Sequence, residues 1–145
     1  MGGHHWTDDH GNSHAVVIAR EFDLVISLFN LPGHGPDPGI EHLVAEIPDG
    51  PLIGDQILTV QQLARAAAQA VRDGRTVLVR CNAGYNRSGL VVAQTLIELG
   101  HEASAAIGTI RQKRSPRALT NQLFEDYLIT GLPVAHLLAD LDTFS

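Results

Sequence analysis

The segment from Cys81 to Ser88 contains residue types that together could perform nucleophilic chemistry on an anionic group. Cys81 is the single cysteine of the chain, Arg87 follows six positions later, and Ser88 comes directly after it. A thiolate is a strong nucleophile, and a planar guanidinium can bind two phosphate oxygens in parallel hydrogen bonds. The Ser88 hydroxyl can donate to the sulfur and make it a better leaving group. The segment therefore predicts a phosphate site with Cys81 as its nucleophile.

The elements on either side of this segment would give it the geometry that phosphate binding needs. Thr76–Arg80 is an apolar, β-branched run that predicts a strand, and Ser88–Leu99 is apolar nearly all round, as a central buried helix would be. A turn between a strand and a helix N-terminus directs backbone N–H groups at one point, where the helix dipole adds positive potential. Such a nest accommodates a phosphate dianion and also favours a thiolate.

The residues between the cysteine and the arginine are expected to surround the bound phosphate. Gly84 supplies a position without steric restriction, which is useful where a chain curls around a ligand. None of the five carries a charge, so Arg87 would be the only cation within the turn. The predicted substrate-binding residues are Asn82, Ala83, Gly84, Tyr85 and Asn86.

The remaining sequence predicts an α/β fold in one domain spanning residues 1–145. Further strands are expected at Asp23–Leu28 and His42–Ile47, and two Pro/Gly-rich loops at Asn30–Gly39 and Pro48–Pro51. Additional helices are expected at 59–72, 102–113, 120–130 and 134–141. Strands alternating with helices predict a central, mostly parallel or mixed sheet of about four to five strands, flanked by helices.

Composition narrows the classes of function. The chain has 145 residues, 44% of them hydrophobic, and a net charge of −6, which predicts a globular core and argues against broad nucleic-acid binding. No stretch is apolar enough to span a membrane, and the N-terminus lacks the pattern of a secretory signal. We therefore expect a cytoplasmic protein, a monomer without membrane association. The single cysteine excludes a disulfide within the chain.

The segment Val77–Gly89 resembles the phosphate loop of the protein tyrosine phosphatase superfamily, which reads Cys, five residues, Arg, then Ser or Thr. The small dual-specificity branch is the most similar, and the resemblance extends from about Phe22 to Leu128. It implies a central sheet flanked by helices and a two-step hydrolysis through a cysteinyl-phosphate. It also implies that no metal and no organic cofactor takes part, and that the active-site pocket is shallow.

The resemblance also implies an aspartic general acid on a loop upstream of the cysteine. Asp49 lies 32 residues before Cys81, in a Pro/Gly-rich loop after the predicted strand 42–47. Its role would be to protonate the leaving oxygen and then to activate the attacking water. Asp55 is the competing candidate.

Two residues depart from the pattern of most relatives. Arg80 stands where most of them have a histidine that tunes the thiolate. Its cation could serve the same purpose, or it could point away from Cys81. Asn86 occurs at this position in relatives that hydrolyse RNA 5′-triphosphates, which keeps an RNA substrate open.

The predicted activity is therefore hydrolysis of phosphotyrosine, and of phosphoserine or phosphothreonine, in a phosphoprotein or phosphopeptide. An RNA 5′-phosphatase of the same superfamily and a non-catalytic module that binds phosphoproteins are the alternatives. Arg114 and Arg117 are candidates for substrate contact, and Asn121 for a place near the phosphate loop. The N-terminal cluster consists of His4, His5, Asp8, Asp9, His10 and His14. It could bind a metal, but a solvated loop is the simpler expectation.

Overall fold

The apolar run that begins at Leu24 forms the middle strand of a parallel sheet. In the computed structural model, which describes residues 1–142, β3 (Leu24–Ser27) lies between β4 (Glu41–Val44) and β5 (Val77–Arg80). Both pairings are parallel, and every residue of β3 is buried. A strand covered on both faces reads as a continuous apolar run, which is why this one was evident from sequence. The α/β class and the parallel character of the sheet are confirmed.

The sheet has three strands within residues 1–142, fewer than the four or five expected. Beside β5, the chain forms only an isolated parallel bridge between Gly2 and Arg80. The Gly2 N–H donates to the Val79 carbonyl over 2.9 Å, and the Gly2 carbonyl accepts from the Cys81 N–H over 3.1 Å. Two successive glycines have no side chains to pack on a pleated surface, so the edge stays short. The last three residues of the predicted domain lie outside the described residues.

The described part of the chain has five helices, of which the first lies between β4 and β5 and the others follow β5: α1 (Gly54–Arg72), α2 (Arg87–Glu98), α3 (Ala103–Lys113), α4 (Gln122–Thr130) and α5 (Leu132–Asp142). Helix α1 begins five residues before the predicted start, because the Gln56 side chain accepts the Ile53 N–H over 3.0 Å and so caps the first turn. Apolar periodicity alone does not reveal such a cap. No helix in the described part of the chain has the length and apolar character needed to cross a bilayer.

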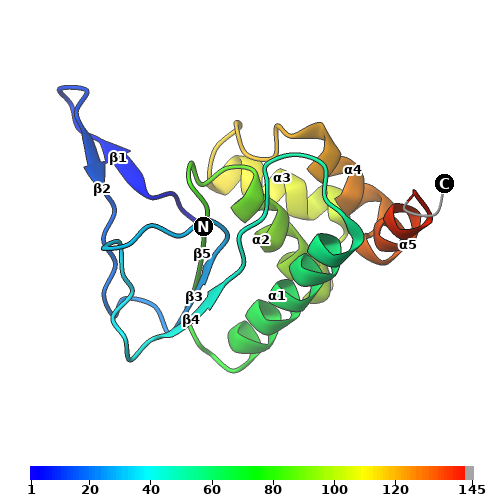
Figure 1. Cartoon of the computed structure of the whole chain (residues 1–145), viewed down its shortest axis with the longest axis horizontal. Helices are drawn as coiled ribbons and strands as arrows, with labels where there is room; N and C mark the ends of the chain where they lie inside the picture. Colours follow the sequence, from blue (N-terminus) through cyan, green and yellow to red (C-terminus); the bar gives the residue numbers. More distant parts are fainter. Residues whose placement is uncertain (143–145) are drawn as a thin grey trace.

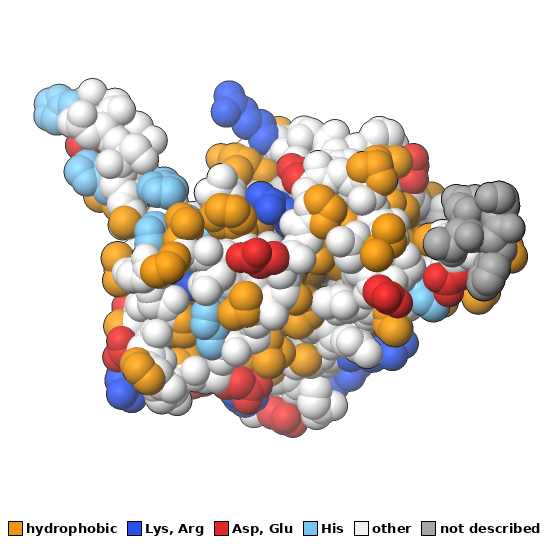
Figure 2. All heavy atoms as spheres, viewed as in Figure 1, with side chains coloured by type: hydrophobic (Ala, Val, Ile, Leu, Met, Phe, Trp, Pro, Cys, Tyr) orange, Lys and Arg blue, Asp and Glu red, His pale blue; other side chains and the backbone are white. Residues whose placement is uncertain are grey.

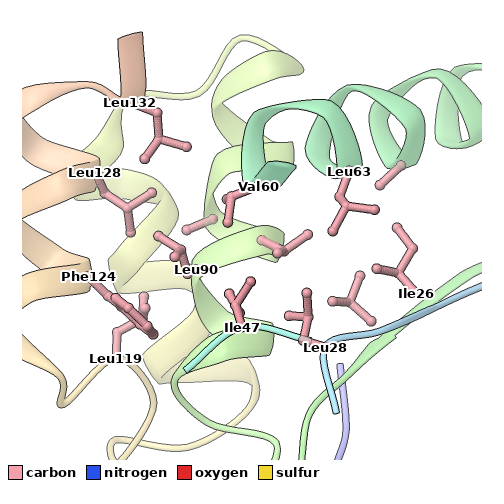
Figure 3. Packing of buried hydrophobic residues seen from close by; sticks show 14 of the residues in the cluster. Ile26, Leu28, Ile47, Val60, Leu63, Leu90, Leu119, Phe124, Leu128 and Leu132 are labelled. Atoms are coloured by element: carbon pink, nitrogen blue, oxygen red, sulfur yellow. The ribbon is translucent and has the colours of Figure 1, made fainter. Parts of the chain in front are cut away.

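Helix α2 occupies the centre of the helical layer, and the other elements hold it in place. It packs against α1, α3, α4 and β5, and all these helices lie on one side of the sheet (Figure 1). Leu90 of α2 points into a cluster that includes Val60 from α1 and both Phe124 and Leu128 from α4 (Figure 3). Leu90, Val60 and Phe124 are fully buried. Because α2 is packed on several sides, its N-terminus and the loop before it have a fixed position.

The N-terminal segment forms a hairpin that the sequence did not predict. β1 (His5–Thr7) pairs antiparallel with β2 (Ser13–Ala15), with His5 opposite Ala15. Asp8 organises the turn, since its Oδ1 accepts the N–H groups of His10 and Asn12, each over 2.9 Å. The hairpin projects from the rest of the molecule (Figure 1). The expected solvated loop is thus an ordered, exposed hairpin.

Candidate active site

The loop between β5 and α2 surrounds the Cys81 thiol with hydrogen-bonding groups. Cys81 is 2% exposed. Its Sγ lies 3.4 Å from the Ser88 Oγ, and the Gly84 N–H donates to the same sulfur over 3.3 Å. The sequence-predicted neighbours of Cys81 are therefore brought together around it.

Gly84 has a conformation and surroundings that require glycine. Its φ is +79°, and a Cβ there would lie 2.5 Å from the Gly2 carbonyl carbon and 2.6 Å from the Gly3 nitrogen. Gly3 is equally confined, because its Cβ would lie 2.8 Å from the Asn82 oxygen. The first residues of the chain thus lie directly against the loop, a contact that the sequence did not suggest.

Arg87 begins α2 and carries an unused donor. Its Nε is buried and is without a hydrogen-bond partner among the described residues. One terminal nitrogen donates to the Ile47 carbonyl over 3.3 Å, and the guanidinium lies over the Phe29 ring, 5.5 Å from its centroid. Leaving a buried charged donor unpaired is costly, and an anion at this place would satisfy it.

The N-terminus of α2 is also free of a side-chain cap. Asn86 occupies the N-cap position and makes no capping hydrogen bond. The first N–H groups of a helix have no partner within it, so an uncapped N-terminus offers them, together with the helix dipole, to a ligand. This opening faces the same loop that encloses Cys81. Asn82 and Ala83 of that loop are exposed at its rim.

The Asn86 side chain is instead used to hold Asp49 near the loop. Asn86 Nδ2 donates to Asp49 Oδ2 over 3.1 Å, and Asn121 Nδ2 donates to Asp49 Oδ1 over 2.8 Å. Both carboxylate oxygens are thus engaged, although Asp49 is exposed. The competing candidate, Asp55, lies in the first turn of α1, where a carboxylate interacts favourably with the positive end of the helix dipole. The arrangement favours Asp49 as the acid that works with the loop.

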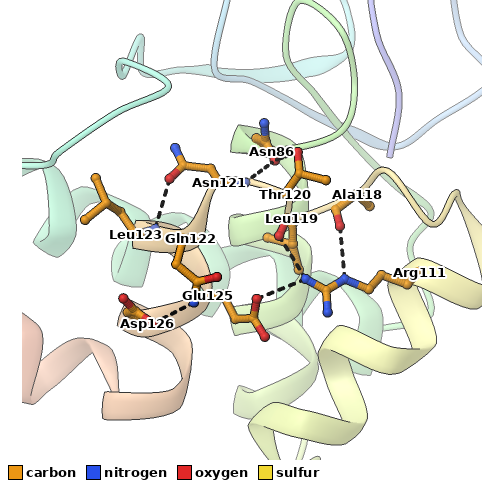
Figure 4. A network of polar contacts seen from close by, with 10 residues as sticks. All are labelled: Asn86, Arg111, Ala118, Leu119, Thr120, Asn121, Gln122, Leu123, Glu125 and Asp126. Carbon is orange, nitrogen blue, oxygen red and sulfur yellow. Dashed lines mark hydrogen bonds and ion pairs between the residues drawn. The ribbon is translucent and has the colours of Figure 1, made fainter.

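A second set of contacts ties the Cys81–Ser88 loop to the segment before α4. Asn86 Oδ1 accepts the Asn121 N–H over 3.1 Å and lies 3.4 Å from the Thr120 hydroxyl (Figure 4). Asn121 also caps α4, because its Oδ1 accepts the Leu123 N–H over 3.1 Å. The Tyr85 carbonyl accepts a further N–H from this segment. Asn121 therefore lies beside the Cys81–Ser88 loop, as expected.

Arg111 holds that segment in place, a role that the sequence did not predict. Its guanidinium donates to the carbonyls of Ala118 and Leu119 over 3.2 and 2.9 Å and pairs with Glu125 at 3.1 Å (Figure 4). Leu119 has a positive φ of 58°, so the bend there needs support. In the sequence, Arg111 belongs to a basic run with Lys113, Arg114 and Arg117, and no local pattern marks it as the arginine that meets these carbonyls.

The two arginines proposed for substrate contact differ in their surroundings. Arg114 donates to the Gly84 carbonyl over 3.2 Å and lies over the Tyr85 ring, 4.9 Å from its centroid. Arg117 is exposed. Arg114, which is also exposed, thus contacts the Cys81–Ser88 loop from outside.

Arg80 points away from Cys81 and anchors the Pro/Gly-rich loop 30–39. It is fully buried, and its three nitrogens donate to Ser27 Oγ at 3.0 Å and to the carbonyls of His34 and Gly35 at 3.1 and 2.7 Å. Burial lowers the pKa of Arg80. Of the two alternatives for Arg80, tuning the thiolate or pointing away from Cys81, the contacts favour the second, and they stabilise a neighbouring loop.

The N-terminal histidine cluster divides into a buried and an exposed part. His4 is fully buried; its Nε2 lies 2.6 Å from the Phe29 carbonyl, to which it donates, and its Nδ1 lies 3.3 Å from His34 Nδ1. Burial lowers the pKa of His4, and the charge on Arg80 acts in the same direction. On the hairpin, His14 pairs with Asp8 at 2.8 Å. Among the described residues no group of three or more His, Cys, Asp or Glu side chains is arranged to hold a metal ion.

Solved structures with similar folds are phosphatases. Tk-PTP in its active form is 30% identical and superposes with a TM-score of 0.59, covering 76% of this chain and 80% of its own. Human DUSP28 is 23% identical with a TM-score of 0.63, over 79% of this chain and 81% of its own, which supports the fold alone. Kinase associated phosphatase, at 19% identity and a TM-score of 0.62 over 75% and 67% of the two chains, does likewise. No protein-family model and no curated protein sequence matches the chain.

Proposed function

The chain belongs to the protein tyrosine phosphatase superfamily, and from this membership we propose that it is a cysteine-dependent phosphatase of phosphoproteins, of the dual-specificity type. Its substrates would be phosphate monoesters, with phosphotyrosine as the first and phosphoserine and phosphothreonine as further targets. Cys81 is the nucleophile, Arg87 binds the phosphoryl oxygens, and Asp49 transfers protons.

One observation carries the proposal: around the loop that holds Cys81, the described residues leave donors available to an anion. The buried Arg87 Nε has no partner among the described residues, the α2 N-terminus has no side-chain cap, and the Gly84 N–H already points at the sulfur. A phosphoryl group would receive these donors at once. Hydrogen bonds that strengthen as charge spreads over the phosphoryl oxygens stabilise the transition state more than the ground state.

In the first step the Cys81 thiolate attacks phosphorus and the bond to the leaving oxygen breaks. Asp49, in its acid form, gives its proton to that oxygen, so the product leaves as an alcohol or phenol. The Asn86 and Asn121 amides hold the Asp49 carboxyl beside the loop for this transfer. Proton transfer by a positioned group typically contributes about 10²–10⁴-fold in rate.

In the second step water attacks the cysteinyl-phosphate, and the Asp49 carboxylate takes the proton that the water releases. The sulfur–phosphorus bond breaks, inorganic phosphate leaves and the thiolate returns. Ser88 Oγ, 3.4 Å from the sulfur, donates its hydroxyl to the departing thiolate and so makes it a better leaving group. The two steps consume one water and need no oxidant or reductant.

A protein substrate is favoured over an RNA 5′ end. Asn86 was the residue that kept RNA open, and its amide is engaged by Asp49 while its oxygen accepts from Asn121. These contacts account for an asparagine at this position without a nucleotide. The net charge of −6 also opposes the approach of a polyanion.

The proposal is tested by hydrolysis of p-nitrophenyl phosphate from about pH 5 to pH 8 without added metal. We expect wild-type turnover that disappears in Cys81→Ser. In Asp49→Ala we expect a rate lower by about 10²–10⁴-fold, together with loss of the decline at high pH. Asp55→Ala, which removes the competing carboxylate, is the matched control and should retain wild-type rates. Turnover that persists in Cys81→Ser, or a folded wild type without turnover, would contradict the proposal.

A further inference from the structure

The hairpin formed by residues 5–15, called the arm below, has no evident structural role in the body of the protein. All six residues of its strands are exposed. An isolated two-stranded hairpin is marginal in water, yet this one is ordered by the Asp8 turn and by stacking of Trp6 on His14, with ring centroids 4.5 Å apart. Within residues 1–142 its strands pair only with each other, so both outer edges are unpaired. Such edges are templates for another extended chain.

The base of the arm is attached to the rim of the phosphate loop. The His4 N–H donates to the Asn82 carbonyl over 3.0 Å, and the His4 carbonyl accepts the Val16 N–H over 2.8 Å, which closes the hairpin. Gly3 contacts the Asn82 and Ala83 backbone. A strand rises about 3.3 Å per residue, so Thr7 lies about 10 Å beyond this attachment. Figure 2 shows the arm extending outward and leaving an open space between it and the helical body.

A series of rings connects the phosphate-binding arginine with the arm. The Arg87 guanidinium lies 5.5 Å from the Phe29 centroid, and the Phe29 and His4 centroids are 5.8 Å apart. His4 and His34 follow at 5.1 Å, and His34 and His5 at 5.4 Å. His5 is the first residue of β1. The arm is therefore in continuous contact with groups that line the phosphate site.

We propose that the arm binds the polypeptide on one side of the phosphorylated residue, and so makes the enzyme selective for phosphopeptides over small phosphate esters. The inference rests on the proposed function, because Cys81 then determines where the phosphate of the substrate lies. The rim of the loop that holds Cys81 then determines where the substrate polypeptide leaves the site. An extended peptide rises about 3.3 Å per residue, as the arm does. Residues within about three or four positions of the phosphoresidue thus come alongside β1 and β2.

The composition of the arm favours a polypeptide as its occupant. Its turn contains Asp8 and Asp9, and residues 5–15 include no lysine or arginine, which opposes a nucleic-acid strand. Unpaired strand edges offer N–H and C=O groups that an extended peptide can use. Trp6 is 52% exposed, and tryptophan is among the residues that contribute most to protein interfaces.

The test removes the outer part of the arm and leaves its attachment intact. Replacing residues 6–14 by Asn-Gly joins His5 to Ala15, which already face each other, through the two-residue turn that hairpins favour. Trp6→Ala is the milder variant, and Val71→Ala, at an exposed apolar residue of α1, is its matched control. Each is assayed with p-nitrophenyl phosphate and with a phosphotyrosine peptide carrying several residues on both sides of the phosphoresidue.

We expect kcat/KM for the peptide to fall about tenfold or more in the shortened variant, mainly through KM, while kcat/KM for p-nitrophenyl phosphate changes less than about twofold. Trp6→Ala should show a smaller change of the same kind, and Val71→Ala none. Equal losses for both substrates, or no loss for either, would overturn the proposal. Peptide Kd values measured in a Cys81→Ser background test the arm without turnover. Absent wild-type turnover counts against the proposed function, whereas a peptide Kd that does not depend on the arm counts against the arm. The Kd of a 5′-phosphorylated RNA is measured in the same background. If the arm affects that Kd and not the Kd of the peptide, the proposal is also wrong.

Discussion

Replacing Gly84 by alanine should lower activity far more than the same replacement at Gly74, a glycine with a similar backbone conformation. Gly84 has a φ of +79°, and Gly74, after α1, has a φ of +76°. An alanine at either position pays roughly 1–2 kcal/mol for the left-handed conformation. Gly74 has no atom within 4 Å of its would-be Cβ, whereas Gly84 would meet the Gly2 carbonyl carbon at 2.5 Å and the Gly3 nitrogen at 2.6 Å. Backbone atoms cannot swing aside, so the loop itself must move.

That movement displaces a donor of the site. The Gly84 N–H lies 3.3 Å from Cys81 Sγ, and loss of one such preorganised donor typically costs about 10²–10³-fold in kcat. We therefore expect Gly84→Ala to lose at least about 10²-fold in kcat for p-nitrophenyl phosphate, and Gly74→Ala to stay near the wild-type kcat. The left-handed conformation alone should lower the Tm by a few degrees in both variants, since about 1 kcal/mol corresponds to 2–4 °C in a domain of this size.

The assay combines kcat with Tm from thermal unfolding and with the rate at which iodoacetate alkylates Cys81. Slower alkylation in Gly84→Ala, but not in Gly74→Ala, is expected because the displaced N–H no longer favours the thiolate. If both variants kept the wild-type kcat and alkylation rate, the Gly84 N–H would not act on the sulfur, and the reasoning about the loop would be wrong.

Three further predictions follow from contacts around the site. Asn121→Ser should retain the α4 cap, since serine is a good N-cap, but it loses the amide that holds Asp49. We expect kcat to fall about tenfold with the Tm nearly unchanged. An unchanged kcat would show that the amide does not position the acid. Arg80→Met removes three hydrogen bonds from a buried cation, each worth about 1.5–3 kcal/mol, so urea unfolding should show a loss of several kcal/mol in the free energy of unfolding. Because Arg80 points away from Cys81, the rate at which iodoacetate alkylates the thiol should be nearly unaffected. A large decrease in that rate would indicate that Arg80 does act on the thiolate. Burial lowers the pKa of His4 below its usual 6.5, so just below pH 6.5 the unfolded chain binds a proton that the folded chain does not. Stability therefore falls as the pH falls through this window, by at most about 1.4 kcal/mol per pH unit. His4→Gln should flatten the dependence of Tm on pH in this window, and an undiminished slope would show that other groups cause it.

Sequence patterns were sufficient for the parts of the fold that are apolar and regular. The runs that became β3 and β5 are short, β-branched and bounded by breakers, and the helix after Ser88 is apolar on nearly every face. These strong local signals determined the order strand, turn, helix, and with it the place of Cys81. Asp49 came from the resemblance, which implies an acid on a loop upstream of the cysteine, and its contact with Asn86 places it beside the loop, where the variants above test its role.

The features that sequence did not reveal depend on contacts between distant residues. Each strand of the hairpin has only three residues, too few for a periodic signal, and its order comes from the side chain of Asp8 and from stacking of Trp6. Arg111 was one of several arginines in a basic run, and Arg80 was considered only for its effect on Cys81, but both donate to carbonyls of neighbouring loops. Which carbonyls a loop leaves unpaired depends on how the loop folds, so no local pattern marks the arginine that will meet them.

Trapping the covalent intermediate tests the central claim most directly. Asp49→Ala, mixed with p-nitrophenyl phosphate and rapidly denatured, is digested and analysed by mass spectrometry. Because p-nitrophenolate is a good leaving group, loss of the acid slows the first step less than loss of the base slows the second, so the intermediate should accumulate in this variant. We predict one phosphoryl group on the peptide that contains Cys81, and none in Cys81→Ser. Hydrolysis of the ester with no phosphoryl group on that peptide at any time point would contradict the two-step mechanism.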